Sequence, residues 1–239
     1  MKVVFAHGAF VTDGAWWWHR MQAPLADLGL GSQAVELPSC GNGPVDDLGD
    51  MYADADAVRA VLGRSSEPVI LCGHSYGGMV ITDAGADQPN VAHLVYLDAV
   101  MPDQDQTHAG FGGPEPSPWM EPRDDGTIGI RTEQPELLHA LFLHDCDQEI
   151  RDEAMRRLTR QSLTAFAQPP RGVAWRTVPS TYVVCTDDRA TPPAVQRAWS
   201  KPATEVRELH SGHHPFLSQP DLLAHLIGEV ARTTTNREA

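Results

Sequence analysis

The chain has 239 residues, of which 41% are hydrophobic, and a formal net charge of −14. This length fits one large domain or two small ones, and the apolar content is sufficient for a full core, so disorder is not indicated. The negative charge argues against anionic partners. We therefore expect neither nucleic acid nor an anionic membrane surface to be bound.

The cysteines and the N-terminus bear on the cellular compartment. The four cysteines lie far apart with no C-x-x-C pair, at Cys40, Cys72, Cys146 and Cys185. Such spacing fits neither a disulfide framework nor a zinc site. The first seven residues resemble a short strand rather than a signal peptide, and no run approaches the roughly 18 apolar residues of a membrane span. We expect a cytoplasmic protein and leave open whether it forms a homodimer.

Strand-like apolar runs alternate with helical patterns along most of the chain. The predicted strands are Lys2 to Ala6, Ser32 to Leu37, Val69 to Cys72, Val91 to Leu97, Thr181 to Cys185 and Thr204 to Leu209. The predicted helices run from Ala15 to Leu28, from Asp54 to Leu62, from Gly77 to about Ala86 and from Pro220 to Ala231. One further helix follows Pro193 and ends at Trp199. This alternation predicts an α/β fold with a mostly parallel, doubly wound sheet that has helices on both faces.

The composition changes between Pro102 and Pro179. This stretch is rich in proline and glycine, has no strand-like run, and shows helical patches at Pro135 to Leu143 and Glu149 to Phe166. We interpret residues 102–179 as a helical lid inserted into a core formed by residues 1–101 and 180–239.

The pattern Gly73-x-Ser75-x-Gly77 follows the strand that begins at Val69 and precedes a helix. This context is that of a nucleophile elbow, in which a sharp turn holds a serine hydroxyl at the carboxyl end of the sheet. A Cβ at either glycine would collide with a neighbouring element. We predict that Ser75 is a nucleophile.

A serine hydroxyl needs a base to remove its proton, and the base needs a carboxylate to orient it. Asp187 and Asp188 follow one predicted strand, and His213 and His214 follow the next. We prefer Asp188 because it lies further into its loop. We prefer His213 because His214 precedes a proline, which restricts its backbone to extended conformations. The order Ser, Asp, His is that of α/β-hydrolases.

Two backbone N–H groups are needed to stabilise the oxyanion of an ester. We predict that Tyr76 donates one and that Ala9 donates the other, with Phe10 as the alternative to Ala9. Because neighbouring His213 and His214 should point apart and no metal-binding motif is present, we expect no metal and no cofactor.

Several of these motifs together resemble the α/β-hydrolase superfamily, and its methylesterase and hydroxynitrile lyase branch in particular. They are His7-Gly8-Ala9, Ala15 to Trp18, Gly73 to Met79, Asp98 to Pro102, Val184 to Arg189 and Gly212-His213. The resemblance implies the α/β-hydrolase fold, with Asp188 as the acid and Ala9 as an oxyanion donor. Hydroxynitrile lyases carry threonine after the first histidine and lysine after the catalytic one. Here these positions hold Gly8 and His214, which disfavours a lyase.

We therefore predict a serine esterase that cleaves a small carboxylic ester through an acyl-enzyme. One alternative is a cyclase or acyltransferase of secondary metabolism on the same fold, and another is a hydrolase-like ligand receptor. The side chains expected to contact substrate are Phe10, Trp17, His74, Trp119 and Trp175.

Overall fold

The structure is a computed structural model that describes residues 1–112 and 116–238, with side chains up to residue 235. Within these residues, six parallel strands form the central sheet in the order β10-β9-β5-β4-β1-β2. The strands are β1 (Lys2–Ala6), β2 (Gly31–Val35), β4 (Val69–His74), β5 (Val91–Leu97), β9 (Ser180–Cys185) and β10 (Glu205–Leu209). The predicted parallel sheet is confirmed, with strand ends shifted by one or two residues at most.

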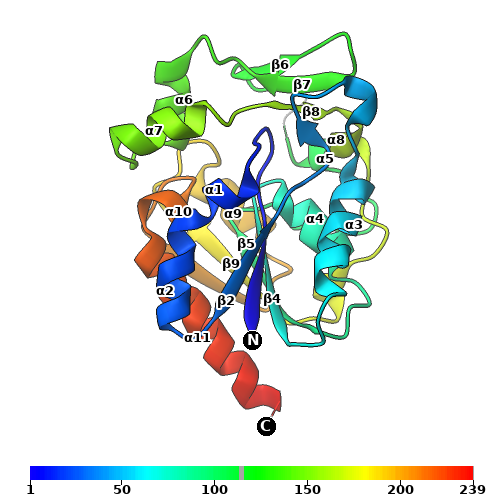
Figure 1. Cartoon of the computed structure of the whole chain (residues 1–239), viewed down its shortest axis with the longest axis vertical. Coiled ribbons are helices and arrows are strands. Elements are labelled where there is room, and N and C mark those ends of the chain that lie inside the picture. The colour runs from blue at the N-terminus through cyan, green and yellow to red at the C-terminus, as the bar shows by residue number, and fades with distance from the viewer. Residues whose placement is uncertain (113–115, 239) are drawn as a thin grey trace.

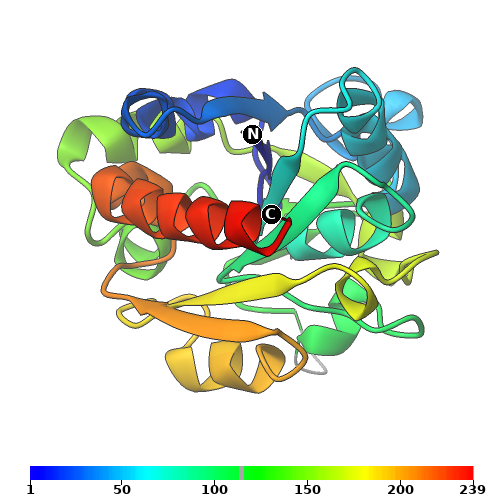
Figure 2. The ribbon, with the colours of Figure 1, turned by 90° about the horizontal axis from the view of Figure 1, so that it is seen from below.

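Helices cover both faces of this sheet (Figure 2). On one face lie α1 (Gly14–Trp17), α2 (Gln22–Asp27) and α11 (Pro220–Glu238), and on the other lie α3 (Met51–Leu62) and α4 (Gly77–Ala84). The pleat sends alternate residues to opposite faces, so Val3 and Phe5 pack in one core and Val4 and Ala6 in the other. Because both faces are buried, the strands are continuous apolar runs.

The predicted helix from Ala15 to Leu28 is interrupted in the structure. It divides into α1, a 3-10 turn η1 (His19–Met21) and α2. The break begins at Trp18, whose backbone leaves helical geometry and whose indole stacks on Phe5 with ring centroids 4.1 Å apart. Pro24 then lacks the N–H that would continue the helical bonds back to Arg20. Trp17 and Trp18 are buried and Trp16 is half-buried, so two of the three consecutive tryptophans belong to the core.

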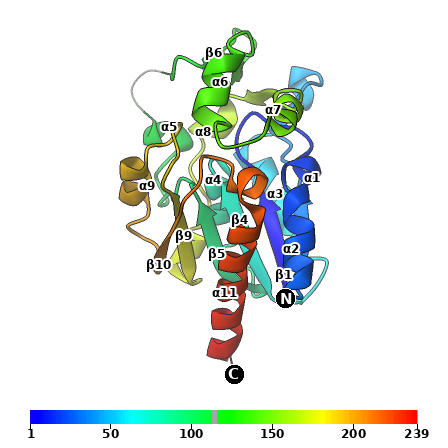
Figure 3. The same cartoon turned by 90° about the vertical axis from the view of Figure 1, so that its left-hand side faces the viewer.

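Most of residues 102–179 lies over the carboxyl ends of the central strands (Figures 1 and 3), whereas the last part packs beside α4 and leads to the start of β9; residues 113–115 are outside the described part. The helices here are α5 (His108–Phe111), α6 (Pro135–Phe142), α7 (Gln148–Met155), α8 (Thr164–Ala167) and the 3-10 turn η3 (Ala174–Arg176). The expectation of no strand was wrong. β6 (Met120–Pro122), β7 (Thr127–Ile130) and β8 (Arg160–Ser162) join β3 (Cys40–Gly41) in an antiparallel sheet. These strands are too short to show a local apolar pattern.

The remaining elements are α9 (Pro193–Trp199), α10 (Pro215–Ser218) and the 3-10 turn η2 (Val45–Asp47). Both termini lie at the end of the molecule opposite residues 102–179 (Figure 1). Among the described residues, none of the helices combines the length and the apolar character that crossing a bilayer requires.

Candidate active site

The chemistry-bearing residues gather where the strand order reverses. β1 and β4 are neighbours whose ends pair Ala6 with Gly73, and the chain leaves them toward opposite faces of the sheet. In doubly wound sheets this switch point leaves a crevice at the carboxyl ends of the strands, where ligands bind. The loop that begins at His7 and the turn that holds Ser75 border this crevice.

Ser75 sits on a strained turn between β4 and α4. Its φ of 53° lies in the left-handed region, which costs an L-residue roughly 1 kcal/mol or more. A Cβ on Gly73 would lie 2.5 Å from the carbonyl oxygen of Gly77, and a Cβ on Gly77 would lie 2.6 Å from that of Ala6. Both glycines are therefore required by backbone packing, as the nucleophile-elbow interpretation assumes.

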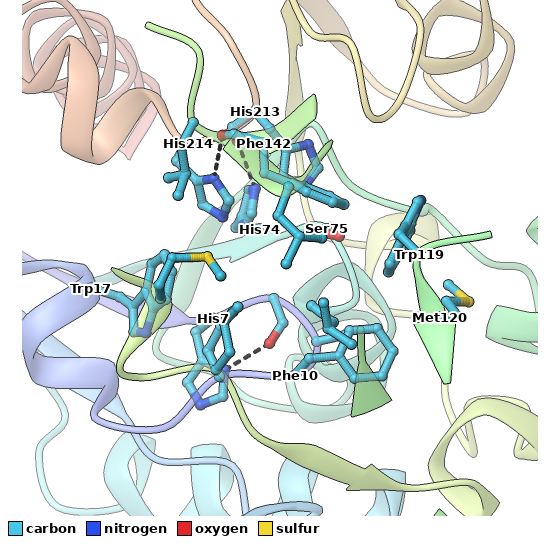
Figure 4. A pocket seen from close by; sticks show the side chains of 18 of the residues that line it. His7, Phe10, Trp17, His74, Ser75, Trp119, Met120, Phe142, His213 and His214 are labelled. Atoms are coloured by element: carbon cyan, nitrogen blue, oxygen red, sulfur yellow. Dashed lines mark hydrogen bonds between the residues drawn. The ribbon is translucent and has the colours of Figure 1, made fainter. Parts of the chain in front are cut away.

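His213 and Asp188 form a buried pair behind Ser75. The Nδ1 of His213 donates to Oδ2 of Asp188 over 2.9 Å, which leaves Nε2 as the unprotonated nitrogen of the neutral ring. Ser75 and His213 both line the same cavity (Figure 4). Between these two described residues the structure has no direct hydrogen bond. Asp187, by contrast, faces solvent beside His210.

The surroundings of Asp188 keep it ionised. It accepts hydrogen bonds from the N–H groups of Ala190 at 2.8 Å and Thr191 at 3.0 Å, and from the Gln196 amide at 3.4 Å. Burial alone would raise the pKa of Asp188. The charge on His213 and hydrogen bonds, among them those from His213 and from the N–H of Ala190, outweigh burial and hold the pKa below its ordinary value. Asp188 can therefore stabilise an imidazolium at His213.

The loop after β1 presents one N–H group to the cavity. The Phe10 N–H donates to Oε1 of Gln161 over 3.2 Å, so it is already occupied. Among the described residues, the N–H groups of Ala9 and Tyr76 have no protein acceptor. A Cβ on Gly8 would lie 2.9 Å from Nδ1 of His74, so glycine is needed where this loop passes the elbow. Of the two donors considered from the sequence, this geometry favours Ala9.

The cavity above Ser75 is lined by apolar and aromatic side chains and by histidines (Figure 4). Its empty volume is about 760 Å³, which includes the open mouth. Among the described residues, none that lines it is an aspartate, glutamate, lysine or arginine. Burial lowers the pKa of His108 to about 4 and, together with the charge of His213, that of His214 to about 3. These two histidines are therefore uncharged near neutral pH, and the wall has no acidic side chain, lysine or arginine among the described residues.

Comparison with known proteins identifies the family. A family model described as the alpha/beta hydrolase family matches residues 3–226. The chain belongs to the alpha/beta hydrolase family. The match also bears out the resemblance read from the motifs, near the esterase branch.

Two curated relatives of this alpha/beta hydrolase are named for two different reactions, one as a hydrolase and one as a synthase. A pyrethroid hydrolase from Sphingobium wenxiniae is 30% identical over 197 residues, which cover 76% of this chain and 70% of that protein. A norfluorocurarine synthase 2 from Strychnos sp is 27% identical over an alignment of 260 positions, gaps included, which covers 95% of this chain and 94% of that one. Among solved structures, a pyrethroid hydrolase from Sphingobium faniae superimposes with a TM-score of 0.86 at 28% identity and 97% coverage of both chains.

The structure places four of the five side chains that we expected to contact substrate in the cavity wall and one outside it. Phe10, Trp17, His74 and Trp119 of this alpha/beta hydrolase lie in the cavity wall. Trp175 does not line it, because η3 carries this residue to the rim of the core, where its indole N–H donates to the carbonyl of Pro102 over 2.8 Å. The sequence shows Trp175 as one more aromatic residue in a loop-rich segment and gives no sign of its direction.

The histidines of this site are closer together than we expected. One ring nitrogen each of His74, His213 and His214 lies within 4.8 Å of the other two, so the expectation that His213 and His214 point apart was wrong. Each ring also has a protein partner: His74 bonds to the His213 carbonyl, and His214 to that of Phe142, both at 2.9 Å. These bonds give the cluster a structural role, and the absence of a metal stays a prediction.

Sequence reasoning missed Asp98 and Gln161. Asp98 directly follows β5, and its Oδ2 lies 2.9 Å from Nδ1 of His213. Its position at a strand end is a signal that the sequence does contain. Gln161 lies in β8, within a polar tripeptide, and no local pattern connects it to the loop after β1.

Proposed function

We propose that this protein is a serine esterase that cleaves uncharged, apolar carboxylic esters through an acyl-enzyme. The observation that carries the proposal is the convergence of three features on one cavity. These are the strained Ser75, His213 with Asp188 hydrogen-bonded behind it, and the unoccupied N–H group of Ala9 in the cavity wall, with that of Tyr76 directly after Ser75 in the chain.

In the first half of the reaction, Nε2 of His213 takes the proton of Ser75 while Oγ bonds to the ester carbonyl carbon. The N–H groups of Ala9 and Tyr76 stabilise the resulting oxyanion. The intermediate then collapses, the bond to the alkoxy oxygen breaks, and His213 passes its proton to the departing alcohol. Asp188 stabilises the imidazolium throughout.

In the second half, water attacks the acyl-enzyme. His213 takes one proton from the water as its oxygen bonds to the carbonyl carbon. Collapse of the second tetrahedral intermediate returns the proton to Oγ of Ser75 and releases the carboxylic acid. Apart from this water molecule, the steps use only groups of the chain and of the ester.

The chemistry of the cavity supports the substrate class. An ion that leaves water for an uncharged, apolar site loses its hydration without gaining a partner. Phe10, Trp119 and Phe142 meet edge to face at the wall, with ring centroids 6.1 Å and 4.9 Å apart, and offer flat apolar surfaces. The similarity to a pyrethroid hydrolase supports a bulky apolar ester. Residues 102–179 supply much of this wall, in keeping with a lid.

The decisive experiment compares the wild-type protein with Ser75→Ala on p-nitrophenyl esters of increasing chain length. We expect kcat to fall by roughly 10⁴- to 10⁶-fold in the variant. A fluorophosphonate probe should label the wild-type protein at Ser75 and leave the variant unlabelled. Undiminished turnover in the variant would contradict the assignment, and an unlabelled but folded wild-type protein would favour the receptor alternative.

A second candidate is an acyl-transfer cyclase, in which a nucleophile within the substrate captures the acyl group. The similarity to a norfluorocurarine synthase and the apolar cavity favour it. Turnover in ¹⁸O-labelled water separates the two functions. Hydrolysis places one label in the product carboxylate, whereas internal capture places none.

A further inference from the structure

Two carboxyl groups compete for one nitrogen of His213. Oδ2 of Asp188 and Oδ2 of Asp98 each lie 2.9 Å from Nδ1. The neutral ring carries a single hydrogen there, and its direction satisfies the hydrogen bond to Asp188. The Asp98 side chain is fully buried, and among the described residues neither of its oxygens has a hydrogen-bond partner of good geometry.

The two carboxyl groups differ in what supports a negative charge. Asp188 accepts from two backbone N–H groups and one side-chain amide, whereas Asp98 has no such donors. Two carboxylates this close to each other cannot both ionise cheaply. Burial first, and then the neighbouring Asp188, hold the pKa of Asp98 well above its ordinary value. Asp98 is therefore the protonated member, and its proton is within reach of Asp188.

The fold holds Asp98 in this place. Its backbone N–H donates to the carbonyl of Val183 on the neighbouring strand over 2.9 Å, and its φ of 45° turns the chain sharply at the end of β5. The side chain can thus reach His213 without any movement of the backbone.

We propose that Asp98 is a positioning residue of the active site, a reserve acid that takes over the Nδ1–H of His213 when Asp188 loses its charge. The inference rests on the proposed function, because it assigns a role within that catalytic site. In the intact protein, neutral Asp98 supports the Asp188 carboxylate. When Asp188 is replaced by a neutral residue, Asp98 loses its proton to solvent and its carboxylate accepts the hydrogen bond from His213.

The other titratable groups that face Asp98 stay neutral in this exchange. They are the Tyr182 hydroxyl and the Cys185 thiol of β9, and burial raises the pKa of both well above neutrality. Asp188 faces Asp98 from the loop after β9, and His213 faces it from the loop after β10. The exchange of a proton therefore lies between the carboxyl groups of Asp98 and Asp188, with His213 as their shared hydrogen-bond donor.

The test compares Asp98→Asn, Asp188→Asn and the double variant by kcat/KM on p-nitrophenyl butyrate at several pH values. A carboxylate-to-amide change in a triad costs about 10⁴-fold when nothing replaces the acid. We expect that loss only in the double variant, with Asp188→Asn about 10- to 100-fold below wild type and Asp98→Asn within a few-fold of it. The activity of Asp188→Asn should rise with pH as Asp98 ionises.

The proposal is overturned if Asp188→Asn is as inactive as the double variant, or if its pH profile matches that of the wild-type protein. Asp188→Ala, tested in parallel with and without Asp98→Asn, replaces the asparagine series if that series does not fold by circular dichroism.

A second readout does not depend on turnover. The imidazole Nδ1–H of His213 should give a downfield proton NMR signal in the wild-type protein and in Asp188→Asn, and lose it in the double variant. Loss of the signal in Asp188→Asn alone would also overturn the proposal. If the wild-type protein hydrolyses no ester, the proposed function fails, while this signal still shows whether Asp98 can bind His213.

Discussion

Gln161 accepts a hydrogen bond from the backbone N–H of Phe10 over 3.2 Å, which joins β8 to the loop after β1 across 151 residues of sequence. The other end of the Gln161 amide donates to Oγ of Ser39 over 2.9 Å. Ser39 donates to the buried carboxylate of Asp54, which also accepts from the Tyr76 hydroxyl over 2.7 Å. One buried network therefore links the two backbone segments that we propose as the oxyanion hole.

Replacing Gln161 with leucine should slow the chemical step. The variant frees the Phe10 N–H and releases the loop that holds Ala9, so the proposed oxyanion donor loses its fixed direction. We expect kcat to fall by about 10- to 100-fold, less than the 10²- to 10³-fold loss of a whole donor, with KM changed little. Steady-state kinetics with p-nitrophenyl butyrate measure this. Gln148→Leu, at an exposed amide paired with Asp152, is the control, and an unchanged kcat in Gln161→Leu would contradict the prediction.

Replacing Gly77 with alanine should destabilise the elbow. The new Cβ would lie 2.6 Å from the carbonyl oxygen of Ala6 and 2.8 Å from that of His7, and both are backbone atoms of β1 and its loop. We expect the free energy of unfolding to fall by about 2–3 kcal/mol, as in other overpacked sites. Urea denaturation measures it. Gly43→Ala is the matched control, since within the described part of the chain no atom other than those of its own neighbours lies within 4 Å of its Cβ position. Equal stability of the two variants would contradict the packing role assigned to Gly77.

Asp54 should make stability depend on pH between about 4 and 6. Burial raises its pKa to about 6 from 3.8, against the hydrogen bonds from Ser39 and Tyr76 that favour the charged form. The folded protein thus binds a proton that the unfolded chain has lost, and this contribution disappears as pH rises through 6. One pKa unit corresponds to about 1.4 kcal/mol. As pH rises across this range, the free energy of unfolding of the wild-type protein should therefore fall by roughly 2–3 kcal/mol relative to that of Asp54→Asn.

Urea unfolding of both proteins at several pH values measures this difference. Subtraction removes the opposite effect of the buried histidines, such as His108, whose lowered pKa makes stability increase with pH over the same range. A difference between the proteins that stays constant, or that grows in favour of the wild type as pH rises, would show that Asp54 is ionised throughout.

The uncharged cavity should discriminate against charged esters. We expect kcat/KM for the p-nitrophenyl monoester of succinate to be at least about 100-fold below that for p-nitrophenyl butyrate, because its carboxylate would be desolvated without a partner. Met120→Arg places a guanidinium at the half-buried rim of the cavity. This variant should reduce the ratio between the kcat/KM values for the two esters. Equal activity on the two esters in the wild-type protein would count against the apolar substrate class.

The sequence by itself determined the central sheet and the elements of the site that lie at its strand ends. Buried parallel strands are local apolar runs, so β5 at Val91–Leu97 and β1 at Lys2–Ala6 were predicted at the bounds that the structure has. Ser75, Asp188 and His213 follow such strands, and the topology of a parallel sheet brings their loops to one edge. Local pattern was sufficient here because each element carries its own signal.

Only the tertiary structure decided how distant segments complete the site. The sheet of residues 102–179 forms because β8 pairs with β3 some 120 residues earlier, and such pairing leaves no periodicity in either strand. Side-chain positions likewise depend on the tertiary structure. Trp175 lies outside the cavity wall, whereas His214 lies in it. Asp98, which follows β5, lies beside His213, which follows β10, although β9 separates these two strands in the sheet. These contacts depend on how separate elements pack against each other, and the residues that flank each position in the sequence do not determine that packing.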